Sequence, residues 1–526
     1  MIFLGGLLLF LGLVGLIVQR TLTQLTYFQQ EEYDGSRFIA SGFNIRLYDV
    51  RATGLTLAAL LAVQLGFPTP LALGGLGVVF GAIAFLESRY SYKKPFVKTQ
   101  RATRILRISI VILTLAALSV LWLPVAAVVI IQVVPLVLIA VNAAMTPYEN
   151  RINAGFVSQA REKLERLDPV RIGITGSFGK TTVKHMFAEI LEASGPVFYS
   201  PGSINTVLGH TRHIRERLQW SHKYFVAEMG AYGIGSIDRL CDFIQPRFGI
   251  VTAVGDAHTE RFGSLEVIAQ AKSELVARVC SKGGTAVVNG DVMQYAPFKA
   301  LKDKYGTQIL TVGGSDADVL VDAVEIEGGS WSITLRSDDA RVPETSFELP
   351  LMGDHNVMNS ALAVTMALLI DASTHAQIPF FTKTIAQVPH RLQKIDMPGA
   401  ALILDDAYNS NEIGFMSAVS ALDTLAQERG GRRILVTPGV AELGLEHDRV
   451  HERLGTFCAT RCDVIYVVNP GRIEAFGAAA RAGSAQVIEV PSFFAARAEI
   501  SKSIAADDVV LYENDLPDLL EEKRLL

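Results

Sequence analysis

The stretch that decides the fold is Arg171-Ile-Gly-Ile-Thr-Gly-Ser-Phe-Gly-Lys-Thr-Thr182, followed directly by Val183-Lys-His-Met-Phe-Ala-Glu-Ile-Leu191. The apolar run at 170–174 predicts a short buried strand, and the glycines that follow predict a tight loop. Beyond the loop, apolar side chains recur at helical spacing, at Val183, Met186, Phe187, Ile190 and Leu191. The stretch therefore predicts a strand, a Gly-rich loop and a helix in succession.

This arrangement suits a polyphosphate, because loop N–H groups and the positive end of the helix both face the anion. Lys180 would reach the outer phosphates, and the Thr181 hydroxyl would ligate Mg²⁺. The strict P-loop spacing requires a glycine at Ile174, so the loop is a variant. A Gly-rich turn that merely opens a helix is the alternative. The predicted nucleotide-binding residues of the loop are Gly176, Ser177, Gly179, Lys180, Thr181 and Thr182.

Composition divides the chain into two unlike parts. At 526 residues it should hold several domains. The mean hydropathy of +0.31 is high, and the apolar excess lies before about residue 150. A net charge of −5 argues against a general nucleic-acid binder. The four scattered cysteines are expected to be reduced core thiols.

Residues 1–147 are predicted to form a transmembrane segment of about five helices. The apolar runs lie at 1–18, 55–67, 71–86, 105–121 and 125–145. Since the second run is shorter than the ~20 residues of a full crossing, four crossings are the alternative. The first run has no basic region before it and no cleavage site after it, which indicates a retained anchor rather than a signal peptide.

Basic residues predict the orientation of this segment. They gather in the first loop, which includes Arg20, and in the loop between the third and fourth runs, at 89–104, while the two Pro-containing tips hold none. The positive-inside rule places both basic loops in the cytoplasm. Five crossings then put the N-terminus outside and everything after residue 146 inside, at the plasma membrane. The segment either only anchors the protein or also holds a lipid substrate.

The remaining chain predicts an α/β fold in two further domains. A helical linker is expected at 148–168. Apolar runs alternate with helical patterns at 169–373, which favours a parallel sheet, and period-two alternation at 318–350 predicts a small antiparallel insert. New alternating runs after the boundary at 373 predict a second, doubly wound domain at 374–526.

From about residue 171 to 468 the chain resembles the Mur ligase family, most closely its D-alanyl-D-alanine-adding branch. The family loop Gly-x-Thr-Gly-(Thr/Ser)-x-Gly-Lys-Thr fits residues 173–181. The resemblance implies a P-loop-type central domain, a Rossmann-like C-terminal domain, ATP and Mg²⁺ as cofactors, and ligation of amino acids or peptides to cell-wall precursors. Lys180 would be catalytic.

Three further residues take metal-site or catalytic roles from this resemblance. Glu228, in Phe225-Val-Ala-Glu-Met-Gly-Ala231, matches the Mg²⁺-binding acid at a strand end; a solvated strand terminus is the alternative. His258 matches a metal-site and catalytic histidine, although a loop histidine is often incidental. Lys272 matches the lysine that the family carries as a carbamate and that helps to hold a second Mg²⁺; an exposed helix lysine is the alternative.

Nucleotide contacts follow from three later motifs. His355-Asn356-Val-Met-Asn359 resembles the family's adenine contact, with helix capping as the alternative for Asn356. Arg391 matches the arginine that opens the last domain. Asp405-Asp406-Ala-Tyr-Asn409-Ser-Asn411 matches the hallmark at a strand's carboxyl end, which implies nucleotide binding by Asp406 and Asn409. Plain turn residues are the alternative for the two aspartates.

The sequence departs from the family at both ends. Residues 1–150 replace the small domain that holds a uridine-diphosphate sugar, and an acidic stretch at 511–517 replaces the usual Lys-Gly-Ser-Arg. We therefore expect a membrane-anchored, ATP-dependent amide ligase that works through an acyl phosphate. It would join an amino acid or dipeptide to a small-molecule or lipid-linked acceptor of the cell envelope. A polymer ligase of the poly-γ-glutamate-synthase kind and a membrane ATPase component without ligase chemistry are the alternatives.

Overall fold

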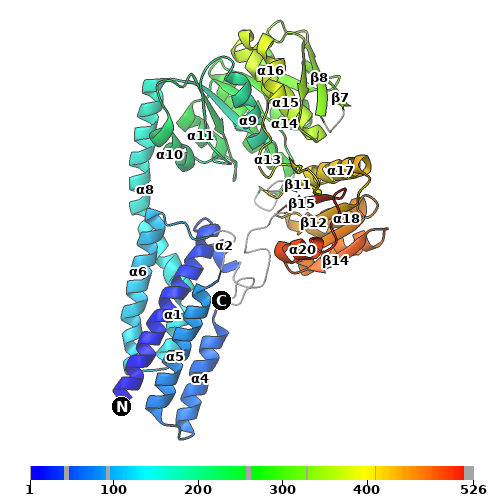
Figure 1. Ribbon diagram of the computed structural model, residues 1–526. Helices are drawn as coiled ribbons and strands as arrows, with labels where there is room; N and C mark the ends of the chain where they lie inside the picture. The colour runs from blue at the N-terminus through cyan, green and yellow to red at the C-terminus, as the bar shows by residue number, and fades with distance from the viewer. Residues whose placement is uncertain are drawn as a thin grey trace. The chain divides into compact units, whose positions relative to one another are not determined.

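A computed structural model describes residues 2–40, 47–90, 95–255, 262–326, 330–408, 410–441 and 443–514. The chain forms two compact units, one built on Met1–Asn153 and the other on Ala154–Asp515. Figure 1 shows helices alone in the first unit and two sheets with covering helices in the second.

The first unit is a helical bundle. Its helices are α1 (Ile2–Gln30), α2 (Gly35–Ala40), α4 (Val50–Gln64), α5 (Thr69–Ser88), α6 (Gln100–Ala117), the short η1 (Leu118–Leu121), α7 (Ala126–Gln132) and the first part of α8 (Val134–Leu167), which continues into the second unit. Side-chain caps begin two of them, since Asp49 accepts from the Ala52 N–H and Thr99 from the Ala102 N–H. α1 and α5 lie side by side, and glycines let their backbones approach closely. The carbonyl of Gly77 packs against Gly12, and the backbone of Leu8 packs against Gly77.

Among the described residues of this unit, three helices are long and apolar enough to cross a membrane, namely α1 from Phe3, α5, and α6 continued through η1. The bent pair α7 and α8 would make a fourth if the two count as one span. Most of the run predicted at 55–67 lies in α4, which ends at Gln64 and, at 15 residues, is short of a full crossing. The predicted linker at 148–168 is not a separate element, because α8 continues without interruption to Leu167.

The prediction of a first loop that includes Arg20 is wrong, because α1 continues as a helix to Gln30. The Arg20 side chain is 1% exposed and lies between two acids. It pairs with Asp49, and its Nε lies 3.4 Å from Glu87 Oε2. Gln132 lies close by and donates to the Asp49 carbonyl at 3.0 Å. The bundle therefore contains a buried polar cluster.

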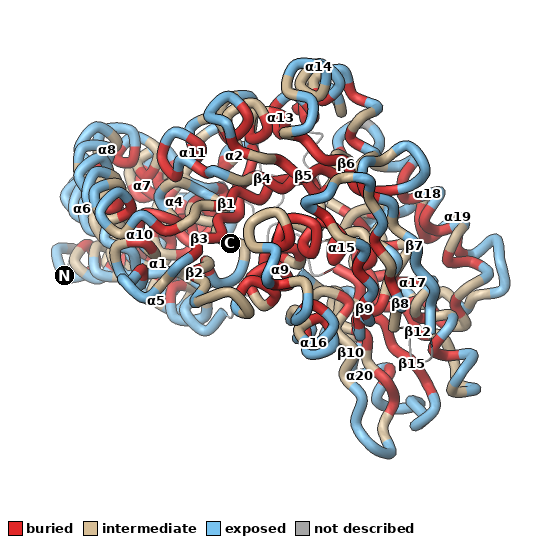
Figure 2. The backbone as a smooth tube through the Cα atoms, turned by 90° about the horizontal axis from the view of Figure 1, so that it is seen from above, coloured by how far each residue is buried: buried red, intermediate tan, exposed pale blue. Residues whose placement is uncertain are grey.

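A nine-stranded sheet forms the central domain of the second unit, in the order β2-β3-β1-β4-β5-β6-β7-β8-β9. The first six strands are parallel, as the alternation of strands and helices predicts. Strands are β1 (Val170–Thr175), β2 (Val197–Tyr199), β3 (Tyr224–Glu228), β4 (Phe248–Val251), β5 (Thr285–Asn289), β6 (Ile309–Gly313), β7 (Val319–Ile326), β8 (Ser330–Ser337) and β9 (Thr345–Leu349). Figure 2 shows β1, β3, β4 and β5 as a buried centre.

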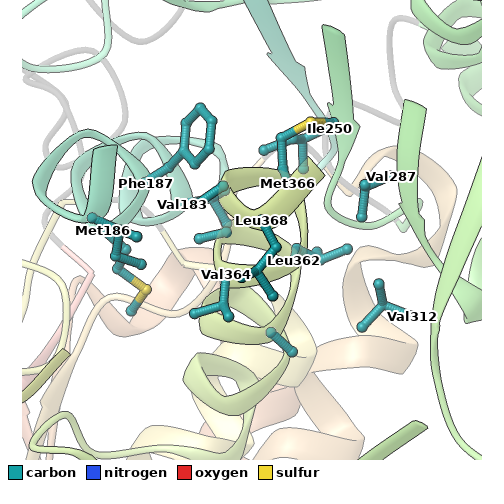
Figure 3. Close-up of a cluster of buried hydrophobic side chains, with 14 of the residues drawn as sticks. Val183, Met186, Phe187, Ile250, Val287, Val312, Leu362, Val364, Met366 and Leu368 are labelled. Atoms are coloured by element: carbon teal, nitrogen blue, oxygen red, sulfur yellow. The ribbon is translucent and has the colours of Figure 1, made fainter. Parts of the chain in front are cut away.

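Helices of the central domain pack on this sheet. They are α9 (Lys180–Leu191), α10 (Val207–Arg217), α11 (Ser236–Ile244), α13 (Leu265–Ser281), α14 (Ala296–Tyr305), α15 (Asp354–Ile370) and α16 (Ile378–Lys383), with short turns at η2 (Gly290–Gln294), η3 (Gly306–Gln308) and η5 (Ala372–Gln377). In Figure 3 side chains of α9 and α15, such as Phe187 and Met366, meet Ile250 and Val287 of the sheet.

The antiparallel insert predicted at 318–350 is confirmed, because β7, β8 and β9 pair antiparallel. They extend the main sheet through β6 rather than forming a separate body. The same core includes Ile378 and Ile385, which lie beyond the boundary predicted at 373. The central domain therefore continues through α16.

A six-stranded sheet in the order β10-β11-β15-β12-β13-β14 forms the C-terminal domain. Among the described strands only β10 is antiparallel. Helices cover both faces of the sheet in two separate cores, so the doubly wound prediction is confirmed. Its strands are β10 (Gln393–Ile395), β11 (Leu402–Asp406), β12 (Arg433–Thr437), β13 (Val464–Val468), β14 (Gln486–Val490) and β15 (Val509–Glu513). The helices are α17 (Glu412–Arg429), η6 (Gly444–Glu446), α18 (His447–Cys458), η7 (Pro470–Arg472), α19 (Glu474–Arg481) and α20 (Phe493–Ile500).

Candidate functional site

The glycine loop lies between the carboxyl end of β1 and the start of α9. Gly179 caps α9 with φ 77°, a left-handed conformation that glycine adopts without strain. Its missing side chain leaves room for the Asn359 amide, which lies against it. Ser177 holds the loop to the segment after β4, because its hydroxyl donates to the Gly255 carbonyl at 3.0 Å. The first turn of α9 thus opens toward Asn359.

Lys180 folds back over this loop. Its ammonium donates to the Gly176 carbonyl at 2.7 Å and to the Ser177 carbonyl at 3.0 Å. Burial lowers the pKa of Lys180 to about 8; the carboxylate of Glu228 opposes this shift, and the charge of Arg391 adds to it. The lysine is therefore held where a phosphate in the loop would meet it.

Thr181 and Glu228 come together beneath the loop. Glu228 ends β3, whose register places it beside Ile174 of β1. The Thr181 hydroxyl donates to Glu228 Oε2 at 3.0 Å, and Lys184 Nζ donates to the same oxygen at 3.1 Å. Because Glu228 is only 1% exposed, the solvated-terminus alternative is wrong. Burial of the carboxylate is compensated by the Lys184 cation.

Lys272 lies on α13 and is 5% exposed, so the exposed-lysine alternative is also wrong. Burial lowers the pKa of its amine well below the usual value, and the nearby charge of Lys180 acts in the same direction. A lowered pKa favours the neutral amine, which is the form that can react with carbon dioxide to give a carbamate.

The charges around the loop favour an anion. Lys180 and Lys184 both lie near the carboxylate of Glu228, which leaves an excess of positive charge for a polyphosphate. The Thr181 hydroxyl and the Glu228 carboxylate are oxygen ligands of the kind that Mg²⁺ prefers, and they lie close enough together to hold one Mg²⁺. Within the described residues no three His, Cys, Asp or Glu side chains gather as a metal site.

Asn356 and Asn359 begin α15, and both are buried. The capping residue is Gly353, so the capping alternative for Asn356 is wrong. The Asn356 amide donates to the Met352 carbonyl at 2.7 Å, and Asn359 donates to Asn356 Oδ1 at 3.2 Å. These bonds fix the Asn359 amide beside the loop and the Asn356 amide beside a cavity of about 40 Å³. The cavity is lined by Thr182, Pro350, Leu351, Met352, Asn356, Gln387, Val388, Arg391, Leu392 and Lys394.

Arg391 enters this cavity from an unusual turn. Both of its neighbours have left-handed backbones, with φ 60° at His390 and φ 50° at Leu392. The two aspartates at the end of β11 hold the turn: Asp405 Oδ2 lies 2.8 Å from His390 Nδ1, and Asp406 Oδ1 accepts from the Leu392 N–H at 3.0 Å. Asp405 Oδ1 also accepts from the Ala407 N–H at 3.2 Å, the contact of a turn residue, so the structure does not contradict the plain-turn alternative.

The structure brings most of the predicted residues together. Gly176, Ser177, Gly179, Lys180, Thr181, Glu228 and Asn359 meet at the loop, while Thr182, Asn356 and Arg391 line the cavity. Asp406 supports Arg391 through Leu392. His258 and Asn409 lie outside the described residues.

Sequence reasoning missed Lys184 and Glu513. Lys184 follows Lys180 by one helical turn and so shares its face, which is a signal that the sequence offered. Glu513 lies in the acidic stretch that replaces the family's basic motif, and it is fully buried against Asp406.

Comparison with known proteins agrees with this geometry. The Mur ligase middle domain matches residues 174–367, and the Mur ligase glutamate ligase domain matches residues 390–512. Together the two matches cover more than half of the chain.

Curated relatives are named UDP-N-acetylmuramoyl-tripeptide–D-alanyl-D-alanine ligase. The protein from Mycobacterium tuberculosis is 34% identical over 307 residues, which is 57% of this chain and 58% of that relative. The one from Escherichia coli K12 is 31% identical over 288 residues, 55% of this chain and 62% of the relative. This chain thus spans about three-fifths of the length of these relatives.

A solved structure shares the fold. The crystal structure of MurF from Acinetobacter baumannii aligns with a TM-score of 0.58 at 25% identity, over 69% of this chain and 77% of that one. Through its middle and C-terminal domains, this chain therefore belongs to the Mur ligase family.

Proposed function

We propose that the protein is an ATP-dependent carboxylate–amine ligase that forms an amide through an acyl phosphate. The observation that carries the proposal is the convergence of Lys180, Thr181, Glu228 and Asn359 at one loop. The names of the curated relatives support a D-alanyl-D-alanine dipeptide as the amine and a peptidoglycan precursor as the acid.

In the first step, an acceptor carboxylate oxygen attacks the γ-phosphorus of ATP, the bond to the β,γ-bridging oxygen breaks, and ADP leaves. Lys180 and the N–H groups of the loop stabilise the negative charge that develops on the phosphoryl oxygens. In the second step an amine attacks the acyl carbon. The tetrahedral intermediate loses phosphate, and the amine loses a proton, to give the amide.

Thr181 and Glu228 would hold Mg²⁺, which supplies positive charge beside the β- and γ-phosphates. Lys184 holds the Glu228 carboxylate in place by donating to Oε2. Lys272, once carbamylated, would add a second carboxylate on the same side. Asn356 and Arg391 would contact the nucleotide from the cavity side.

We propose further that the first unit anchors the ligase in the plasma membrane, with the catalytic module on the cytoplasmic side where ATP is available. The apolar helices α1, α5 and α6 support this location, as does the gathering of basic residues at 89–104. A membrane anchor favours an acceptor presented at the bilayer, such as a lipid-linked precursor. The amine partner is an amino acid or dipeptide.

The full chain in detergent, supplied with ATP and Mg²⁺, tests this proposal. Acceptors would be a uridine-diphosphate muramoyl tripeptide, its lipid-linked form and an oligoglutamate, each offered with D-alanyl-D-alanine, D-alanine or glutamate. Mass spectrometry would identify an amide product formed in step with ADP. Turnover of ATP with every acceptor but without an amide would contradict ligase chemistry. Turnover should disappear in Lys180→Ala and persist in Lys299→Ala, whose side chain is exposed.

A further inference from the structure

A carboxyl pair lies at the carboxyl edge of the C-terminal sheet. Glu513 ends β15, Asp406 ends β11, and the two residues are in register on neighbouring parallel strands. The Glu513 side chain is fully buried, and the Ser410 hydroxyl donates to its Oε1. Its other oxygen, Oε2, has no hydrogen-bond donor in the described structure.

The strand register places Asp406 and Glu513 side by side at one edge of the sheet, and Glu513 Oε2 is buried there without a donor among the described residues. Two carboxylate ions at this edge would repel one another, and neither would have a hydrogen atom to donate. One proton held within the pair would remove the repulsion and allow a hydrogen bond between the two acids, as in other sites where two acids lie together.

The surroundings place this proton on Glu513. Burial raises the pKa of Glu513 well above its usual range, and the charge of Asp406 acts in the same direction. Burial also raises the pKa of Asp406, to about 6, against the opposing influence of Arg391 and the Leu392 N–H. The other titratable groups that face the pair are Asp405 beside Asp406 and the Cys458 thiol beside Glu513.

Asp406 connects this pair to the cavity. Its Oδ1 accepts from the Leu392 N–H at 3.0 Å, which fixes the turn that carries Arg391. Left-handed backbone at a residue as large as Leu392 is strained, so the turn persists only while such contacts hold it. A negative charge on Glu513 would repel Asp406 and loosen this contact.

We propose that Glu513 is a positioning residue for nucleotide binding: its proton bonds it to Asp406, and Asp406 in turn holds the turn that presents Arg391 to the cavity. The inference rests on the proposed function only through nucleotide binding.

Titration of the full chain with ADP and Mg²⁺, from about pH 6 to about pH 9, tests this role. The wild type should bind about tenfold more weakly at the upper end than Glu513→Gln, because the amide donates to Asp406 without titrating. Glu513→Ala should lose about tenfold in affinity at every pH. Lys180 contributes the same pH dependence to all three proteins, so the difference between wild type and Glu513→Gln isolates Glu513. Equal pH profiles, or wild-type affinity in Glu513→Ala, would overturn the inference.

Thermal unfolding gives a second readout that needs no nucleotide. A carboxyl with a raised pKa binds its proton more tightly in the folded state, so it makes stability fall as pH rises above its unfolded value. This slope should be smaller in Glu513→Gln and unchanged in Glu452→Gln, whose side chain is exposed. If the wild type bound no ADP, the proposed nucleotide site would fail, and the unfolding slopes would still test the shared proton. Equal slopes in all three proteins would rule that proton out.

Discussion

At the scale of single residues, Lys180 should report nucleotide binding through its proton. Its pKa of about 8 means that the amine is largely neutral in the free protein above that pH. A bound triphosphate favours the charged form and raises the pKa, so binding takes up as much as about one proton and weakens as pH rises. Calorimetric titration with AMP-PNP and Mg²⁺ near pH 8.5, in buffers of different ionisation enthalpy, measures this uptake.

Lys180→Arg is the matched control for that experiment, because a guanidinium stays charged throughout this range. Its binding should take up no proton. An uptake equal to that of the wild type would mean that another group, and not Lys180, is the one that titrates.

Lys184 should stabilise the folded protein, and added Mg²⁺ should partly replace it when it is removed. Lys184→Met leaves the Glu228 carboxylate buried without its cation, which costs about 3–5 kcal/mol of unfolding free energy. Added Mg²⁺ can take the place of that cation, so it should raise the melting temperature of the variant more than that of the wild type. Lys299→Met should behave as wild type, since its side chain is exposed. Equal Mg²⁺ responses in all three would place the metal away from Glu228.

At the scale of elements, the contact between α1 and α5 should depend on one glycine. A methyl group at Gly77 would collide with the backbone of Leu8, whereas one at Gly75, two residues earlier, would meet open space. We expect Gly77→Ala to destabilise the first unit by about 1–3 kcal/mol and Gly75→Ala to be neutral or slightly stabilising. Limited proteolysis of the full chain in detergent, with cuts before residue 153 read by mass spectrometry, compares them. Equal cleavage rates would show that this helix contact is not needed.

Elements with a strong local pattern were predictable from the sequence. β3, at Tyr224–Glu228, ends at the predicted acid. A short apolar run that is followed by a single Glu and then a Gly is typical of a buried strand that ends at the Glu. The turn at Arg391 was not predictable, since leucine disfavours left-handed backbone and the turn is held by contacts with Asp405, Asp406 and Tyr408 of a distant segment. Arg20 was misplaced for a related reason: its partners lie 29 and 67 positions away along the chain, so no local pattern reveals them.

At the scale of the whole molecule, the proposed location of the second unit links the number of membrane crossings to the side on which the N-terminus lies. The proposed ligase reaction needs ATP, so the proposed orientation requires the second unit to lie in the cytoplasm. An odd number of crossings then places the N-terminus outside, and an even number places it inside. The sequence favoured five, whereas length and composition give three helices, or four with the bent pair. The side of the membrane on which the N-terminus lies therefore distinguishes five crossings from four, whatever the substrate is.

Cysteine labelling can measure this parity, because all four native cysteines are buried and should react poorly. We would introduce Phe3→Cys at the N-terminus, Leu123→Cys at a predicted outer tip and Ser221→Cys in the catalytic unit, where all three side chains are exposed. With five crossings, an impermeant maleimide should label the first two in intact cells and the third only after lysis. Protection of Phe3→Cys alongside Ser221→Cys would indicate four crossings. Labelling of Ser221→Cys in intact cells would place the catalytic unit away from ATP and contradict the proposed orientation.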